Sequence, residues 1–294
     1  MSDDFEAQRR HLRALAYRML GSRAEAEDVV QDCWLRWREV DHAQVQSARA
    51  FLSQTATRLC LDRLTSAQAR REQYVGVWLP EPLVDEAMEF HPGPDVITEY
   101  AQDVSIAFML ALERLSPLER AAFLLHDVFD VDFDEVARRL NRSSAACRQL
   151  AARARTHVRE AQPRVEVEPA QRDRLMQAFG MALQRGDVDA LAKELAEDAE
   201  FLSDGGGVVS AVPQPLHGGA LIAKTLIGFT RNIDWTRLAL RAVTINGLPG
   251  GVLYDRVDGT VIQTLAMQLD TQGRIASIYV MRNPHKLAHL QPRH

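Results

Sequence analysis

The chain has 294 residues, of which 46% are hydrophobic, and a formal net charge of −5. This length predicts two or three domains, and the hydrophobic content is high enough for packed cores, which excludes a disordered chain. The negative net charge excludes a uniformly basic coat for nucleic acid. The sign of the charge changes along the chain, however: residues 81–103 contain acids but no Lys or Arg, whereas residues 142–159 contain five arginines and no acid.

The cysteines are isolated in the sequence, at Cys33, Cys60 and Cys147, and none has the spacing of a metal ligand. We therefore expect reduced core cysteines, no metal site and no cofactor. The sequence contains neither a signal-peptide pattern nor an apolar run of membrane-spanning length. These features predict a cytoplasmic protein that makes no contact with a membrane.

Three amphipathic helices are predicted near the N-terminus. The first covers residues 5–20 and ends at Gly21, and Ser22 begins the second. The third runs from Ser47 to about Arg71. Each helix has one apolar face, so together they predict a small all-α domain.

A pair of helices is predicted between Asp132 and Arg159. Phe133 begins an apolar i, i+3, i+4, i+7 pattern, and residues 141–144 supply a turn and the next N-cap. The second helix has an apolar face and an arginine-rich face. This pattern is typical of a helix-turn-helix that places its second helix in the major groove. An ordinary helical hairpin with a solvated arginine face fits these residues equally well.

After Pro169 the pattern becomes α+β. Helices are predicted at 174–185, 188–195 and 220–229. Strands are predicted at 238–245, 251–256, 261–269 and 275–281, joined by turns at Asn246-Gly247, Asp258-Gly259 and Gln272-Gly273. These elements resemble the cone-shaped fold of SnoaL-like and ketosteroid-isomerase-like proteins, in which helices pack into a curved antiparallel sheet.

Two longer segments resemble a known family. AEDVVQDCWLRW followed by RAFLSQTATRLCLDRL is similar to domain 2 of the extracytoplasmic-function group of bacterial sigma-70-type initiation factors. The stretch from LSPLER to ARTHV is similar to their domain 4. The resemblance covers residues 5–160 and implies two partners, core RNA polymerase and promoter DNA with its −35 and −10 elements.

Three short motifs extend the resemblance to nearly the whole chain. WLPEP at 78–82, DGGG at 204–207 and NPHKL at 283–287 are similar to the SigJ-like group, which has a fused SnoaL-like domain. The implied fold is two all-α domains, the second a helix-turn-helix, followed by an α+β cone. The expected boundaries are 1–75 for domain 2, 76–108 for a linker, 109–162 for domain 4 and 168–294 for the SnoaL-like domain.

The resemblance also implies functional residues. The expected DNA-binding residues are Arg58, Asp62, Arg63, Arg70 and Arg71 near the −10 element, and Arg142, Ser143, Ser144, Arg148, Gln149 and Arg153 near the −35 element. The expected polymerase-binding residues are Asp28, Gln31 and Asp32. The expected interdomain or regulatory residues are Trp78, Leu79, Pro80, Glu81, Pro82, Asp204, Gly205, Gly206, Gly207, Asn283, Pro284, His285, Lys286 and Leu287.

We expect no catalytic activity, because no clear acid–base pair is visible among the candidate pocket groups Asp204, His217, Tyr254 and Arg282. A small ligand of unknown identity fits the expected pocket of the C-terminal domain. One alternative is a SnoaL-like isomerase or hydrolase with a DNA-binding arm. Another is a helix-turn-helix repressor, which would have no use for the first helical domain.

Overall fold

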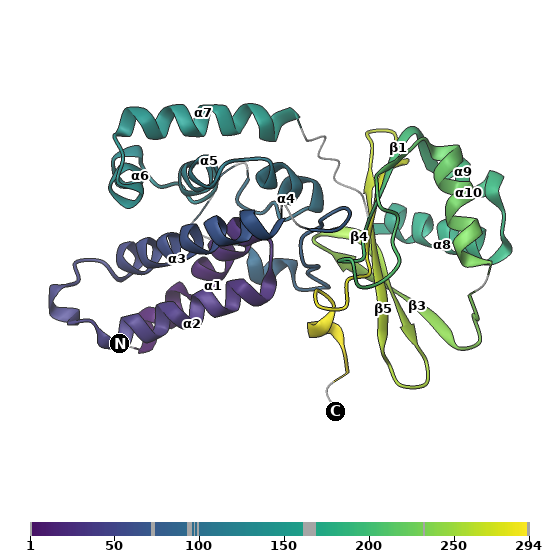
Figure 1. The fold of residues 1–294 in the computed structure, drawn as a ribbon, viewed down its shortest axis with the longest axis horizontal. Coiled ribbons are helices and arrows are strands. Elements are labelled where there is room, and N and C mark those ends of the chain that lie inside the picture. The colour runs from purple at the N-terminus through teal and green to yellow at the C-terminus, as the bar shows by residue number, and fades with distance from the viewer. Residues whose placement is uncertain are drawn as a thin grey trace. The chain divides into compact units, whose positions relative to one another are not determined.

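The computed structural model describes residues 2–71, 74–92, 96, 98, 100–160, 169–231 and 233–292 (Figure 1). The chain forms two compact units, each made of two segments. The first unit contains Met1–Gln73 and Glu86–Gln162, and the second contains Tyr74–Asp85 and Pro163–His294. The expected linker 76–108 is therefore divided, because its beginning belongs with the C-terminal part of the chain.

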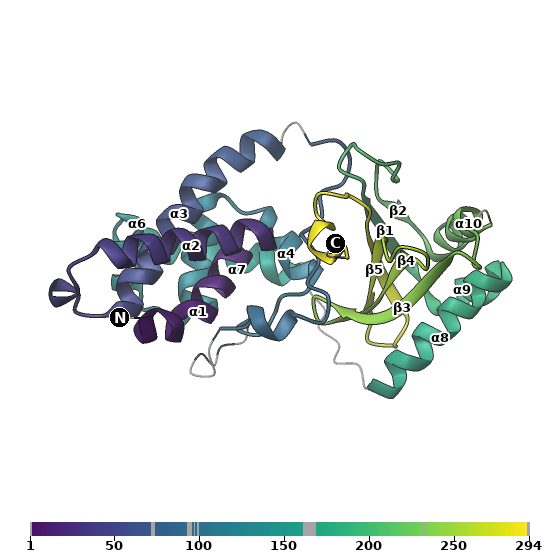
Figure 2. The same ribbon diagram turned by 90° about the horizontal axis from the view of Figure 1, so that it is seen from below.

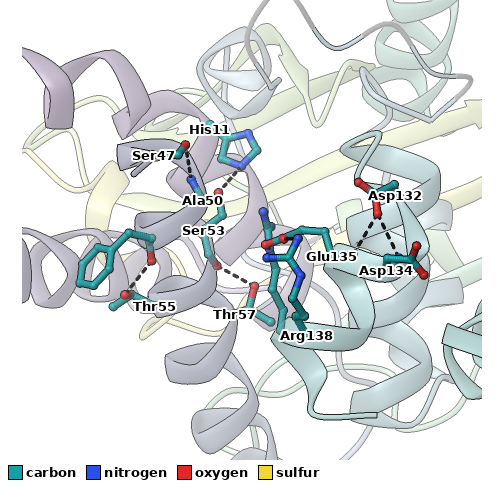
Figure 3. Close-up of polar contacts among 12 residues, drawn as sticks. His11, Ser47, Ala50, Ser53, Thr55, Thr57, Asp132, Asp134, Glu135 and Arg138 are labelled. Carbon is teal, nitrogen blue, oxygen red and sulfur yellow. Dashed lines mark hydrogen bonds and ion pairs between the residues drawn. The ribbon is translucent and has the colours of Figure 1, made fainter. Parts of the chain in front are cut away.

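The first unit begins with the three predicted helices. They are α1 (Ser2–Leu20), α2 (Arg23–Glu39) and α3 (Ala48–Arg71), with a short 3-10 turn at His42–Gln44. Gly21 ends α1 at a positive φ of 69°, and the Ser22 hydroxyl accepts the amide of Glu25 as the N-cap of α2. Ser47 accepts the amide of Ala50 in the same way at the start of α3 (Figure 3).

The second half of this unit contains the predicted helix-turn-helix. Its elements are η2 (Ala87–Phe90), α4 (Ile106–Glu113), α5 (Pro117–Phe123), the π-helical turn η3 (Leu124–Val128), α6 (Phe133–Leu140) and α7 (Ser144–Glu160). Asp132 caps α6 by accepting the amides of Asp134 and Glu135 (Figure 3). Asn141 then adopts a left-handed conformation, with φ of 52°, and Ser143 caps α7.

Two buried arginines tie the two halves of the first unit together. Arg120 donates to the main-chain oxygen of Met19 at 2.7 Å, and Arg18 donates to the oxygens of Phe90 and Ala101 at 2.6 and 2.8 Å. Desolvation lowers the pKa of Arg120 to about 9 and that of Arg18 to about 10, so both stay charged at neutral pH. The expected domains 2 and 4 are thus packed into one unit.

The second unit has a six-stranded sheet in the order β2-β1-β6-β5-β4-β3. Its strands are β1 (Leu195–Asp204), β2 (Leu216–His217), β3 (Leu238–Ile245), β4 (Leu248–Asp255), β5 (Val261–Leu269) and β6 (Ile275–Met281). The helices α8 (Pro169–Arg185), α9 (Val188–Glu194) and α10 (Gly219–Thr230) cover one face of the sheet (Figure 1, Figure 2). A last 3-10 turn, η4, covers Ala288–Leu290.

Most of the predicted elements of this unit are present, and the differences have physical reasons. Asn246 and Gly247 form the predicted two-residue turn, both at positive φ, which places Ile245 opposite Leu248 and starts β4 three residues early. The sheet is not wholly antiparallel, because β1 pairs with β6 in parallel. The three predicted helices pack on the sheet, and α8 contributes Leu175 and Phe179 to the shared core.

Candidate DNA and polymerase surfaces and the linker anchor

The exposed face of α7 carries most of the residues predicted for the −35 element. Gln149 and Arg142 are exposed, and the exposed Arg148 places its guanidinium 5.4 Å from the centre of the Phe133 ring. Arg153 is paired with Glu119 at 2.9 Å, and its side chain remains largely exposed. These four groups present donors and an acceptor outward, as readout of a major groove requires.

The two serines of the same prediction have local roles. Ser143 caps α7, and Ser144 donates a 2.5 Å hydrogen bond to Asp134 on α6. The Ser144 hydroxyl therefore fixes α6 relative to α7.

The residues predicted for the −10 element separate into two groups on α3. Arg58 and Asp62 lie four residues apart on one exposed face of the helix. Arg70 and Arg71 belong to its last turn, and their side chains lie outside the described residues. Arg63 faces α2, where it donates to Asp32 at 2.7 Å and to the main-chain oxygen of Glu25 at 3.0 Å.

Arg63 thereby joins the predicted DNA surface to the predicted polymerase surface. Asp28, on the same side of α2, lies 3.9 Å from Arg63, but its side chain is 66% exposed. Gln31 is also exposed, while Trp37 is buried and Trp34 is half-buried against Phe5. Asp28 and Gln31 are the two members of this set most open to a partner.

The motifs predicted to be regulatory converge within the second unit. Asp204, at the end of β1, is fully buried and binds residues 74–85, which we call the linker segment. One carboxylate oxygen of Asp204 accepts the Leu79 amide at 2.9 Å and the Lys286 ammonium at 2.8 Å. The other accepts the Tyr74 hydroxyl at 2.6 Å and the Gly206 amide at 2.9 Å. Four donors thus compensate the burial of this charge.

Lys286 and Asn283 complete the contact; with Asp204 we call them the anchor residues. Lys286 donates to the Leu79 oxygen at 2.6 Å and lies 4.4 Å from the centre of the Trp78 ring. Asn283 donates to the Tyr74 hydroxyl at 2.9 Å. Burial and the hydrogen bond to Asp204 raise the pKa of Tyr74, so its hydroxyl remains protonated and able to donate.

The glycines after Asp204 allow this close packing. Gly206 has φ of 63°, and a Cβ at this position would lie 2.2 Å from the Asn283 amide nitrogen. Gly207 has φ of 69°, and its Cβ would lie 3.0 Å from the Val75 side chain. Glycine is therefore required at these two positions by both conformation and space.

The second half of the linker segment binds the β3–β4 hairpin. Leu83 and Asn246 exchange two hydrogen bonds, and Val84 forms a β-bridge with Ile245. The segment thus extends the sheet at its β3 edge. Glu81 is buried near His289, which also lies 3.0 Å from the Pro82 oxygen.

Sequence reasoning missed four members of this site, Tyr74, Asp85, Asn246 and His289. Asn246 was predicted only as a turn residue, although its side-chain oxygen accepts the Leu83 amide of the linker segment. Asp85 accepts the amide of Thr244 at 2.8 Å. Among the predicted residues, Pro80, Pro82 and Leu287 are buried, whereas Pro284 and His285 are exposed.

A cavity of about 540 Å³ opens in the second unit between the sheet, α10 and the loop after β1. Of the four polar groups predicted for a pocket, only Arg282 lines it. Asp204 faces the linker segment instead, and His217 lies on β2 with its ring 3.3 Å from Glu200. The described lining residues include no carboxylate and no histidine, so the cavity wall offers no acid–base pair.

The described residues contain no helix with the length and apolar character of a membrane span, and no group of His, Cys, Asp and Glu placed to hold a metal ion. The three cysteines are buried and free, and burial raises the pKa of Cys33 to about 12.

Comparison with known proteins agrees with this architecture. Residues 5–70 match the family model for Sigma-70 region 2, and residues 105–158 match Sigma-70, region 4. The chain is 37% identical to the ECF RNA polymerase sigma factor SigJ of Mycobacterium tuberculosis, over 96% of this chain and 92% of that protein. It is 31% identical to the probable ECF RNA polymerase sigma factor SigI of the same species, over 98% and 94%.

A solved structure is similar over the whole length. The crystal structure of the Mycobacterium tuberculosis SigJ protein superimposes with a TM-score of 0.74 at 32% identity, covering 99% of each chain. Two helical sigma domains followed by an α+β SnoaL-like domain are therefore the fold of this protein. The chain belongs to the ECF RNA polymerase sigma factors, which direct core RNA polymerase to promoters and initiate transcription.

Proposed function

We propose that this sigma factor reads the −35 element with α7, opens the −10 element with α3 and binds core polymerase with α2, while its C-terminal domain controls the linker segment. The observation that carries the regulatory part is the buried Asp204 carboxylate, which accepts from Tyr74 and Leu79 of the linker segment and from Lys286.

The exposed α7 side chains support the −35 assignment. Gln149 carries the amide that pairs bidentately with adenine, and Arg148 carries the guanidinium that pairs with guanine. The Phe133 ring under Arg148 limits its rotamers and so reduces the entropy lost on binding a base. Arg142 and Arg153 would meet phosphates, which set the register of the helix on DNA; Arg153 keeps a largely exposed side chain despite its pair with Glu119.

On α3, Arg58 and Asp62 form the described part of the −10 surface. Arg63 has a different role in this proposal, because its guanidinium is already occupied by Asp32 and by the Glu25 oxygen. It holds α2 and α3 in the orientation that presents Asp28 and Gln31 to polymerase, and it is a positioning residue rather than a DNA contact.

The two promoter elements impose a requirement on the protein. They lie about 25 base pairs apart, which is about 85 Å along B-form DNA. Domains 2 and 4 are joined in the described state by the 2.7 Å hydrogen bond from Arg120 to Met19. They must separate before both elements are bound.

The C-terminal domain limits that separation by holding twelve residues of the connection between domains 2 and 4. Once released, this segment can span up to about 40 Å, at 3.3 to 3.6 Å per residue, in any direction. We therefore assign the C-terminal domain an inhibitory role, exerted on the linker. No catalysis is assigned to it, because Asp204 is committed to the linker segment. The protein would act in the cytoplasm, where core polymerase and the chromosome are found.

The test is run-off transcription with purified core RNA polymerase on a selected promoter library. Wild type should give promoter-specific transcripts, and Lys286→Gln should raise their yield several-fold because it weakens the hold on the linker segment. Lys224→Gln, on the exposed face of α10, is the control for loss of a lysine charge. Unchanged transcription with Lys286→Gln would overturn the regulatory assignment. Absence of all promoter-specific transcripts would overturn the promoter assignments.

A further inference from the structure

The cavity of the C-terminal domain has the size and composition of a small-molecule site. Its volume of about 540 Å³ lies inside the range of about 300 to 1,000 Å³ that is usual for ligand pockets. Phe201, Leu226, Leu253, Leu265 and Val280 supply much of its wall. These side chains come from four strands and α10, which is a rigid frame rather than a loop surface.

One charged residue interrupts this apolar lining. Arg282 is the only charged group among the described residues that line the cavity. One of its terminal nitrogens donates to the main-chain oxygen of Ser210. Its Nε is buried and has no hydrogen-bond partner. A guanidinium beside apolar walls favours an anionic partner, and a carboxylate is the group that pairs with it best.

We propose that this cavity binds an apolar carboxylate, with the acid group on Arg282 and the hydrocarbon body against the strands and α10. Ser203 and Gln263, which also line the cavity, supply further polar groups for the acid end. The apolar walls favour a hydrocarbon over a sugar or nucleotide, because those ligands would leave many polar groups unpaired.

The ligand site shares its backbone with the anchor residues. Ser203 and Arg282 line the cavity, and their chain neighbours Asp204 and Asn283 bind the linker segment. The Arg282 amide donates to the Asp204 main-chain oxygen at 2.7 Å. We expect a ligand that orders Arg282 to order Asp204 and Asn283 as well. This coupling step rests on the proposed regulatory role of the linker segment.

The loop after β1 provides a second connection. Ser210 and Pro213 line the cavity on this loop. On the same loop, Gly207 packs beside Val75, and a Cβ added at Gly76 of the linker segment would lie 4.0 Å from the Pro213 oxygen. The loop thus touches both the cavity and the linker segment.

Isothermal titration calorimetry on the full-length protein tests the site, with sodium decanoate and 1-decanol as probes. The two probes share a hydrocarbon chain and differ in the acid group. Decanoate should bind at least tenfold more tightly than decanol. Arg282→Gln should remove this difference, whereas Arg185→Gln, at the exposed end of α8, should keep it. Equal affinities in wild type, or an unchanged preference in Arg282→Gln, would overturn the proposal, as would no binding of decanoate.

Ile262→Trp provides an independent check that does not change Arg282, because it places an indole in the cavity at a half-buried lining position. It should abolish binding of both probes while the melting temperature stays close to that of wild type. Retention of decanoate binding in this variant would place the probe elsewhere and overturn the proposal.

Hydrogen exchange tests the coupling separately. Decanoate should slow amide exchange in the linker segment several-fold in wild type and not in Arg282→Gln. Binding without slowed exchange would overturn the coupling and leave the ligand site intact. If neither ligand binding nor coupling is found, the promoter assignments still stand, because they are tested by transcription.

Discussion

Lys286 and Asp204 form an ion pair at 2.8 Å, and both members also bind the main chain of Leu79, more than 120 residues from Asp204 in the sequence. Asp204 is fully buried, and the Lys286 side chain is only 16% exposed. The linker segment therefore supplies hydrogen bonds that replace water around the ion pair, and the ion pair in turn holds the segment in position.

Asp204→Asn should destabilise the second unit by about 2 to 4 kcal/mol, because it leaves the Lys286 ammonium without its counter-charge in a largely buried site. Thermal unfolding by calorimetry measures the loss. Hydrogen exchange should show that the linker segment opens first. Asp189→Asn, at an exposed position in the first turn of α9, should change stability by less than about 0.5 kcal/mol. Equal effects of the two variants would contradict the central role of Asp204.

Gly206→Ala should cost about 2 kcal/mol or more, because the added Cβ meets Asn283 at 2.2 Å and the backbone is left-handed. Gly180→Ala in α8 is the matched control, since a Cβ there meets nothing within 4 Å. The control should stabilise the protein by up to about 1 kcal/mol through better helix propensity. Chemical denaturation of both variants measures the difference. A Gly206→Ala protein as stable as wild type would show that the loop can move away from Asn283.

Gln149→Ala and Arg148→Ala should each weaken binding to the −35 element by about 1 to 3 kcal/mol and relax sequence preference at one base pair. Arg159→Ala removes a charge from the same helix about 16 Å further along its axis, and it should lower affinity little and leave preference unchanged. Electrophoretic mobility shifts on a single-substitution promoter set measure both quantities. Uniform weakening across all sequences would show that these side chains contact only phosphates.

His91 gives the first unit a dependence on pH. Burial, together with Arg18 and Arg10, lowers the pKa of His91 to about 4. Above pH 6.5 the ring is neutral in both folded and unfolded chains and contributes nothing. Between pH 6.5 and 4 the unfolded chain binds a proton that the folded chain does not, so stability falls as pH falls.

The partly exposed position of His91 limits this loss to about 1 to 2 kcal/mol. Urea unfolding at pH 7.5 and pH 5.0 measures it, and His91→Gln should show a smaller difference between the two pH values. An equal difference in the variant would assign the pH dependence to other groups.

Arg120→Met should favour separation of domains 2 and 4. Methionine is apolar and cannot donate to the Met19 oxygen or to the Glu113 carboxylate, which Arg120 contacts at 2.7 and 3.0 Å. Energy transfer between dyes placed at Glu39 and His157, both exposed, should decrease relative to wild type. Unchanged transfer would mean that other contacts, such as those of Arg18, are sufficient to keep the domains together.

Local structure was predictable from the sequence because its causes are local. The apolar spacing placed α2 and α6, and Ser22 and Asp132, where these helices were predicted to begin, cap them. Asn246-Gly247 set the hairpin turn and hence the register of β3 with β4.

Long-range partners could not be predicted in the same way. Arg63 is a residue type that often contacts DNA. Its hydrogen bond to Asp32, however, depends on how α2 and α3 cross. Arg18 and Arg120 lie in helical patterns that do not distinguish a buried guanidinium from a solvated one. Tyr74 lacks any motif of its own, and its role arises from Asp204, 130 residues later.

The division of the second unit into two segments also sets an order of events during protein synthesis. Leu79 of the linker segment leaves the ribosome 207 residues before Lys286, the residue that binds its main-chain oxygen. At 5 to 20 residues per second this interval is about 10 to 40 s. Both sigma domains are complete in the nascent chain before the anchor residues are all present. Each newly made molecule therefore passes through a brief period in which its DNA-binding helices exist and its linker is still free.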